Sequence, residues 1–195
     1  MKLLLATTNA GKVREQQEAL QACPIEVVTL SEWPKIQPPE EPGPTFSINA
    51  ACKALFYQRS TKVAALGEDS GLVIDALDGE PGVNSARWLG TKTSYVIKNQ
   101  EILKRLKGLP TNERSARYVC ALALAVNGKV VFSTEGVCSG RIALEPHGDG
   151  GFGYDPIFYY PPLKKTMGTL SLQEKNVISH RGKAMAELVK FLSAL

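Results

Sequence analysis

The chain has 195 residues, 44% of them hydrophobic, and a formal net charge of +4 at pH 7. This length suits one domain, or one domain with two lobes, and the hydrophobic content is ordinary for a protein with a sizeable core. No apolar run approaches the ~20 residues of a membrane span, and the basic residues are too scattered to predict a nucleic-acid-binding stripe, so we expect neither partner.

The cysteines and histidines exclude two kinds of site. The four cysteines stand far apart with no Cys-x-x-Cys pair, and there are only two histidines. This pattern argues against a zinc site and against a disulfide framework. Cys52 and Cys120 lie in apolar runs, so we expect them to be small residues of the core.

The first segments predict a buried strand over residues 2–6, a polar turn over residues 7–12 and a helix over about residues 13–20. The apolar start is too short for a signal peptide, so we expect a cytoplasmic protein. A polar loop before a helix N-terminus is a natural anion site, because free N–H groups and the helix dipole point at it. The spacing is not that of a Walker A loop, and an ordinary strand-to-helix turn is the alternative. The loop supplies Thr7, Thr8, Asn9, Ala10, Gly11 and Lys12.

A proline-rich segment follows a second short strand over residues 25–29. Residues 31–44 contain five prolines and the pair Glu40-Glu41, which predicts a surface loop or lid. The ordinary interpretation of such an acidic pair is a solvated tip. Thr45 then favours the N-cap of a helix to about residue 60. Asn49 and Lys53, four residues apart, share a face of that helix, which is either a solvated edge or the wall of a cleft.

Two acids stand between apolar segments at residues 63–66 and 72–76. The intervening residues are Gly67-Glu68-Asp69-Ser70-Gly71. Carboxylates inside a buried stretch are costly unless they are paired or bind a metal, and hard oxygen ligands suit Mg²⁺. The alternative is a hairpin turn with solvated acids, although an Asp-Gly hairpin would need fewer acids.

The second half of the chain predicts a helix over residues 94–107 and strands over 116–126 and 130–142. Asn127-Gly128 between the strands is a strong hairpin signal. Ser171 and Glu174 have the spacing of a capping box, which predicts a helix from about residue 172. Residues 179–182 interrupt the apolar pattern, and a final amphipathic helix is expected over about residues 183–192.

A glycine-rich loop over residues 147–158 has an unusual composition, with four glycines, two acids and a proline. Its glycines permit close backbone approach to a ligand, and Phe152 and Tyr154 can offer a flat face to a base. Pro156 biases Asp155 to an extended conformation and so anchors its carboxylate. The alternative is a tight turn between two strands.

Together these clusters supply hydrogen-bond donors for phosphate groups, cations, carboxylates for a metal and an aromatic face. Such a set of groups suits a nucleoside triphosphate with Mg²⁺. The sequence resembles the inosine triphosphate pyrophosphatase family, also called the Ham1-like or non-canonical purine NTP pyrophosphatases, in its bacterial-type branch. The motifs that carry the resemblance follow the family's order over nearly the whole chain. They are Ala6–Lys12, Thr45-Phe46 with Asn49-Ala50, Glu68–Leu72, Pro81–Val83 with Ser85–Arg87, Gly150–Phe158, and Glu174-Lys175 with Ile178–Gly182.

The resemblance implies an α/β fold with a long twisted mixed sheet flanked by helices, and two lobes with a central active-site cleft. It also implies that residues 1–195 form a single catalytic domain and that the protein is a homodimer. The implied reaction is Mg²⁺-dependent hydrolysis of ITP, dITP and XTP to the monophosphate and pyrophosphate, which removes these nucleotides from the pool.

The resemblance also implies residue roles. Residues 7–12 would grip the triphosphate, and Lys53 would help to balance its charge. Glu41 and Asp69 would bind the metal, with Glu40 as the competitor of Glu41, and Asp69 would be the general base. The role of Glu68 is open. Ser70 would contact the substrate, and the nucleoside and base would be held by Phe152, Gly153, Tyr154, Asp155, Lys175, His180 and Arg181.

Two other functions remain open from the sequence. One keeps the chemistry but acts on other modified nucleoside triphosphates, as in Maf-like proteins. The other is a non-catalytic module that binds nucleotides or nucleic acid, which would have little need for buried carboxylates and would bind without Mg²⁺.

Overall fold

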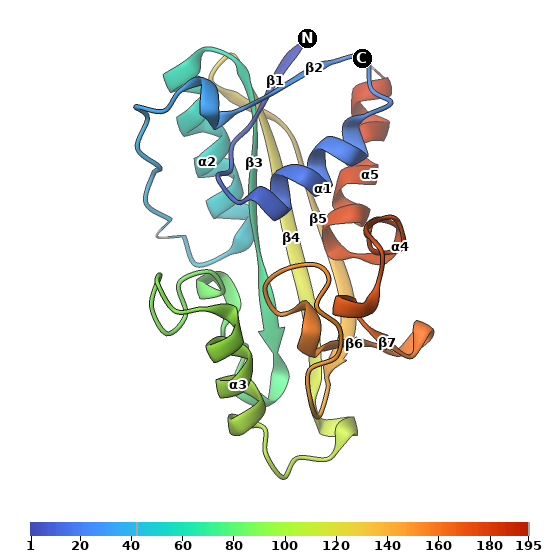
Figure 1. Cartoon of the computed structure of the whole chain (residues 1–195). Coiled ribbons are helices and arrows are strands. Elements are labelled where there is room, and N and C mark those ends of the chain that lie inside the picture. The colour runs from blue at the N-terminus through green and yellow to red at the C-terminus, as the bar shows by residue number, and fades with distance from the viewer. Residues whose placement is uncertain (42, 195) are drawn as a thin grey trace. The chain divides into compact units, whose positions relative to one another are not determined.

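The computed structural model describes residues 1–41 and 43–194, which form two compact units (Figure 1). The first unit contains residues 1–70 and 120–136 and the described residues from 180 onward. The second contains Gly71–Val119 and Val137–Ser179. Among the described residues, no helix is both long and apolar enough to cross a membrane.

The strands form one mixed sheet in the order β2-β1-β3-β4-β5-β6-β7. β1 pairs in parallel with β2 and with β3, whereas β6 pairs antiparallel with β5 and with β7. The predicted mixed sheet of an α/β fold is therefore confirmed. The strand bounds are β1 Lys2–Leu5, β2 Glu26–Thr29, β3 Ala64–Ile74, β4 Ser115–Val126, β5 Lys129–Ile142, β6 Phe158–Tyr160 and β7 Lys165–Thr166.

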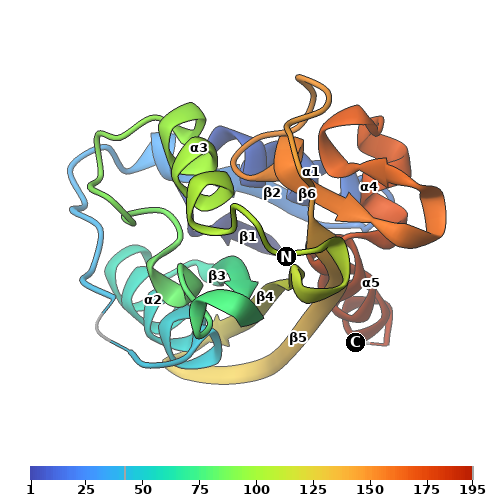
Figure 2. The same ribbon diagram turned by 90° about the horizontal axis from the view of Figure 1, so that it is seen from below.

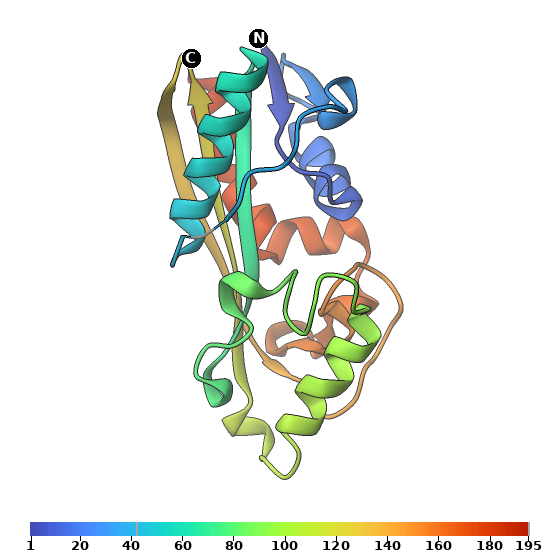
Figure 3. The ribbon, with the colours of Figure 1, turned by 90° about the vertical axis from the view of Figure 1, so that its left-hand side faces the viewer.

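The first unit packs three helices on its part of the sheet: α1 (Ala10–Leu20), α2 (Phe46–Thr61) and α5 (His180–Ser193). Figure 3 shows α2 running along β3. Gly67 of β3 permits this approach, because a Cβ at this position would collide with the backbone of Ala50 and Ala54. α1 packs against α5 over a core that includes Leu3, Leu20, Leu66, Leu122, Met185 and Leu188.

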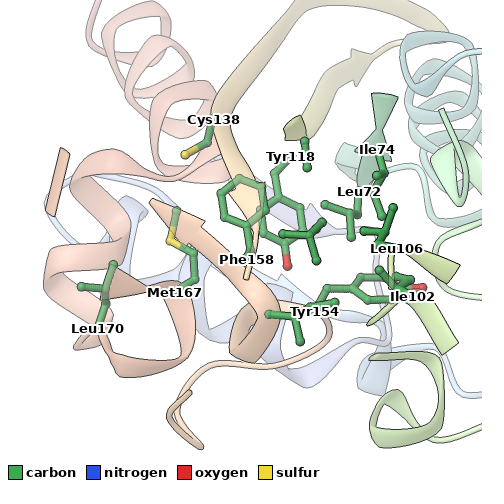
Figure 4. Packing of buried hydrophobic residues seen from close by; sticks show 13 residues of the cluster. Leu72, Ile74, Ile102, Leu106, Tyr118, Cys138, Tyr154, Phe158, Met167 and Leu170 are labelled. Atoms are coloured by element: carbon green, nitrogen blue, oxygen red, sulfur yellow. The ribbon is translucent and has the colours of Figure 1, made fainter. Parts of the chain in front are cut away.

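The second unit contains α3 (Tyr95–Arg105) and α4 (Leu172–Ile178). Its core includes the stacked rings of Tyr118 and Phe158, whose centroids are 4.4 Å apart (Figure 4). The glycine-rich loop before β6 lies between α3 and α4 (Figure 2). The predicted capping box of Ser171 and Glu174 is confirmed at the start of α4.

Three expectations about element boundaries are wrong. The strand is not interrupted at residues 67–71. β3 continues through them, because the buried Glu68 forms ion pairs there. α1 begins at Ala10, three residues early, because the Asn9 side chain caps it. α5 begins at His180 instead of about residue 183.

Candidate functional site

The predicted phosphate loop is an exposed helix N-terminus. The Asn9 side chain accepts a hydrogen bond from the Lys12 N–H at 3.1 Å, and the Asn9 N–H donates to Thr7 Oγ1 at 3.2 Å. Thr8 and Ala10 are exposed, so the first turn of α1 presents backbone N–H groups and the positive end of the helix dipole to solvent. This arrangement suits an anion such as a phosphate group.

Asp69 lies in β3 as a buried carboxylate with two partners. The Asn49 amide donates to Asp69 Oδ2 at 3.0 Å, and Lys53 Nζ lies 3.7 Å from Oδ1. Burial raises the pKa of the Asp69 carboxyl, and the neighbouring Lys53 and Asn49 offset this only in part. A carboxylate with a raised pKa is a better proton acceptor than an ordinary exposed aspartate.

Glu41 joins the same group, because Lys53 Nζ lies 2.9 Å from Glu41 Oε1. Two carboxylates, one from the proline-rich loop and one from β3, thus approach a single cation. Asn49 connects these segments, since its side chain also accepts from the Gly43 N–H at 2.9 Å and donates to the Gly43 carbonyl at 3.2 Å. The sequence pointed to the face shared by Asn49 and Lys53 without assigning this role to Asn49.

Glu68, whose role the sequence left open, is an ion-pair partner. Its side chain is buried, and it accepts from the Arg181 guanidinium at 2.8–3.1 Å and pairs with Lys12 at 3.2 Å. Burial alone would raise the pKa of Glu68, but Arg181 and Lys12 outweigh it and hold the pKa well below its usual range. This ion pair connects Glu68 to Lys12, the last residue of the predicted phosphate loop.

Arg181 lies at the start of α5 and is almost fully buried. Besides Glu68, its guanidinium contacts Glu15 and donates to Ser70 Oγ at 3.1 Å. All of these partners belong to the first unit. The predicted contacts of Arg181 and the neighbouring buried His180 with a purine base stay predictions.

In the second unit, Asp155 is the centre of a buried network. It accepts from Lys175 Nζ at 2.6 Å, from the Phe152 N–H at 2.8 Å and from the Tyr118 hydroxyl at 3.2 Å. Lys175 Nζ also lies 4.6 Å from the centroid of the Phe152 ring. Asp155 therefore fixes both Phe152 and Lys175. Tyr118 was not predicted, because it stands in the apolar pattern of β4.

The interpretation of the Tyr154 ring as a flat face for a base is wrong, because that side chain is buried in the core. Its hydroxyl donates to the Ser85 carbonyl at 2.8 Å, and its ring packs edge-on against Tyr95 with centroids 5.1 Å apart. The ring of Phe152 is half-buried and remains the candidate for stacking.

Helix α3 supports the glycine-rich loop through residues that the sequence did not predict. The Asn99 amide donates to the Gly153 carbonyl at 3.2 Å, and Lys98 Nζ donates to the Ala86 carbonyl at 2.6 Å. Both side chains are buried, whereas Val96 and Ile97 are exposed. Of the two buried polar groups, Asn99 contacts the glycine-rich loop and Lys98 contacts the segment that contains Ala86.

The comparison with known families decides the identity of the fold. A sequence model of the Ham1 family matches residues 3–191. The chain belongs to the Ham1 family. Two solved Ham1 proteins superimpose on it over its full length, one from Coxiella burnetii with a TM-score of 0.91 and 39% identity, and one from Staphylococcus aureus with 0.88 and 35%. They are covered over 100% and 99% of their own lengths, respectively.

Curated relatives in the family carry a functional name. A dITP/XTP pyrophosphatase of Desulforamulus reducens is 45% identical over 195 residues, which cover 100% of this chain and 97% of the relative. A dITP/XTP pyrophosphatase of Geobacillus kaustophilus is 44% identical over 187 residues, or 96% and 92% of the two chains. The resemblance to the inosine triphosphate pyrophosphatase family is therefore confirmed.

Proposed function

We propose that this protein is a nucleoside triphosphate pyrophosphatase. It hydrolyses dITP, ITP and XTP to the monophosphate and pyrophosphate and so removes these nucleotides from the pool. The Ham1 family match and the full-length similarity to dITP/XTP pyrophosphatases support this activity. The structural observation that carries it is the buried Asp69 with its raised pKa, held by Asn49 beside the Lys53–Glu41 pair.

In the proposed reaction, Asp69 accepts a proton from a water molecule as the water attacks the α-phosphorus. A bond forms between the water oxygen and phosphorus, and the bond from phosphorus to the bridging oxygen of the β-phosphate breaks. Pyrophosphate leaves with the electron pair. Lys12, Lys53 and the N-terminus of α1 stabilise the negative charge that develops on the phosphates.

The residues present fit a Mg²⁺ ion. Glu41 and Asp69 already share one cation, the Lys53 ammonium, and they supply the hard oxygen atoms that Mg²⁺ prefers. No group of three or more His, Cys, Asp or Glu residues in the described part of the chain could hold a metal, which agrees with a site that takes one or two carboxylates plus substrate phosphates. When bound, Mg²⁺ would neutralise phosphate charge and polarise the phosphoryl oxygen atoms.

We assign the nucleoside to Phe152, Gly153 and Lys175, with the Phe152 ring as the stacking partner. Hypoxanthine and xanthine carry an acceptor oxygen at position 6, where adenine carries an amino donor. A hydrogen-bond donor that faces position 6 would favour the oxo bases, and a site built for such a hydrogen bond discriminates by about 10⁴-fold or more.

Pyrophosphate release from dITP, ITP, XTP, ATP and modified pyrimidine triphosphates, measured with and without Mg²⁺, tests the proposal. We expect rapid release from the first three substrates only, and only with the metal. Equal rates on ATP and ITP would contradict the purine specificity and favour the Maf-like alternative. Binding of all nucleotides without hydrolysis would favour the binding module.

The remaining proposals concern assembly and location. We propose a homodimer in the cytoplasm without nucleic-acid or membrane partners, as the resemblance to the family implies. Light scattering on the purified chain measures the mass directly, and a monomer at micromolar concentration would contradict the dimer.

A further inference from the structure

The second unit contains a pocket away from the predicted site residues, on the outer face of β5, β6 and β7. In the register of these strands, Ile142 pairs with Phe158, and both side chains are buried in the core. Arg141 pairs with Tyr159, one residue along each strand. Because successive side chains of a strand point to opposite faces, Arg141 and Tyr159 lie together on the face turned away from the core.

A cavity of about 640 Å³ lies over this face. Arg141 and Tyr159 line it, and further lining comes from the segment 142–147, from Lys164 to Thr166, and from Thr111 and Thr169. None of these residues was predicted to contact the substrate. The volume falls in the range of about 300–1,000 Å³ that is typical of small-molecule sites.

Most of the charged residues in the lining are basic. Arg141, Lys164 and Lys165 supply three cations, against the single carboxylate of Glu145. Lys165 lies 3.7 Å from Glu174, and Glu145 lies 3.7 Å from His147. Within residues 1–41 and 43–194, Arg141 and Lys164 have no carboxylate within ion-pair distance, so their charge is available to a ligand.

Hydrogen bonds fix the wall of the pocket. The Thr166 hydroxyl donates to the His147 carbonyl at 2.7 Å, and the Thr169 hydroxyl donates to the Thr166 carbonyl at 2.8 Å. The Gly150 N–H also donates to the Gly168 carbonyl at 2.9 Å. The segment after β5 is thereby tied to the β7 region, which gives the cavity a fixed shape.

We propose that this pocket binds a phosphate-bearing anion at a second site, separate from the residues assigned to hydrolysis. A guanidinium group binds phosphate oxygens in a bidentate manner, and the ammonium group of Lys164 adds a second, mobile charge. The half-buried Tyr159 ring offers an apolar surface beside them. Inorganic pyrophosphate and a purine nucleoside monophosphate share this chemistry, and the experiment distinguishes them.

The test follows backbone amide signals by NMR while inorganic pyrophosphate or IMP is added, without Mg²⁺, to the ¹⁵N-labelled full chain. We expect saturable shifts at residues 141–147 and 164–166 in the wild type. The double variant Arg141→Gln with Lys164→Gln should bind at least about tenfold more weakly there, while its hydrolysis of dITP stays within about twofold. If the shift changes are larger with IMP than with pyrophosphate and saturate at a lower ligand concentration, the nucleotide is the ligand. The opposite result identifies pyrophosphate as the ligand.

Two control variants complete the experiment. Arg59→Gln with Lys129→Gln removes the same charge from exposed positions of the first unit and should leave the shifts unchanged. Lys12→Gln should weaken hydrolysis and still show the shifts at residues 141–147, which separates the pocket from the proposed catalytic function. Absence of saturable shifts in the wild type, or equal losses in both double variants, would overturn the second site.

Discussion

The Asn49 amide lies 3.0 Å from Asp69 Oδ2 and joins the carboxylate of β3 to the loop that carries Glu41. One amide side chain therefore orients the proposed general base and at the same time holds the backbone of Gly43. Such a residue acts through its neighbours, and its contribution should be visible in the titration of Asp69 rather than in substrate binding alone.

The decrease of activity at low pH, the acid limb of the pH profile, should reflect protonation of Asp69. Burial raises its pKa above the ordinary value of 3.8, and the base works only when deprotonated. kcat/KM for dITP should therefore fall as pH decreases and Asp69 becomes protonated. Asp69→Asn should lose about 10³-fold in kcat, within the range for a general base, while binding of the nucleotide largely survives. Near-wild-type turnover of Asp69→Asn would show that another group is the base.

Replacement of Asn49 by leucine should move that acid limb to higher pH. The hydrogen bond from Asn49 favours the charged form of Asp69, so its loss raises the pKa of the carboxyl further. We expect kcat at neutral pH to fall about tenfold or more. Asn49→Gln is the conservative comparison, and Ser47→Ala on the exposed side of the same helix turn is the control. A drop in kcat without any movement of the pH profile would contradict the orienting role.

The buried pair of Glu68 and Arg181 makes stability depend on pH. The pKa of Glu68 is held well below 4.5 in the folded protein, so the folded state favours its charged form. This contribution is fully present above the unfolded pKa and is lost as pH falls through the lower folded pKa. In Glu68→Gln, the free energy of unfolding in urea should therefore decrease less than in the wild type as the pH is lowered from about 6 to about 3.

The same variant removes one of the carboxylates that neutralise the buried charge of Arg181 and leaves Glu15. Breaking a buried ion pair from one side typically costs about 3–5 kcal/mol. We expect a loss of that order at pH 7 for Glu68→Gln, whereas Glu187→Gln, which breaks the exposed pair with Lys190, should cost less than about 1 kcal/mol. Equal small effects for both variants would mean that the buried pair does not stabilise the fold.

Local signals in the sequence predict most of the elements. The hairpin at Asn127-Gly128 forms with positive φ at both residues, and Thr45 and Ser171 cap α2 and α4 as their side chains require. These features depend on neighbours within about four residues. The continuity of β3 depends instead on partners more than 100 residues away, since Arg181 compensates Glu68, and no local pattern contains that information.

The residues of the candidate site also fall into two groups, those that the sequence predicts and those that only the structure reveals. Residue types and their order identified Asp69, Glu41 and Lys53, and the geometry brings these three together. The supporting residues Tyr118 and Asn99 were not identified. In the sequence, Tyr118 looks like an ordinary core residue of a strand and Asn99 like an ordinary polar residue of a helix. Only the packed structure therefore reveals what their polar atoms contact.

Asn99 leads to the last prediction. It is 6% exposed, its amide donates to the Gly153 carbonyl, and its Oδ1 has no hydrogen-bond partner in the described part of the chain. If this contact positions the glycine-rich loop for the nucleoside, Asn99→Leu should raise KM for dITP about tenfold and change kcat much less. Asn99→Gln should recover part of the loss, because it restores a donor.

Gln100→Leu is the matched control, because Gln100 is the exposed neighbour of Asn99 on α3. Steady-state kinetics at fixed Mg²⁺, together with thermal unfolding of each variant, separates loop positioning from general destabilisation. A lowered unfolding temperature with unchanged KM would assign Asn99 to stability alone. A raised KM in a variant that unfolds at the wild-type temperature would place its effect on the nucleoside loop, because the Gly153 carbonyl is the atom to which it donates.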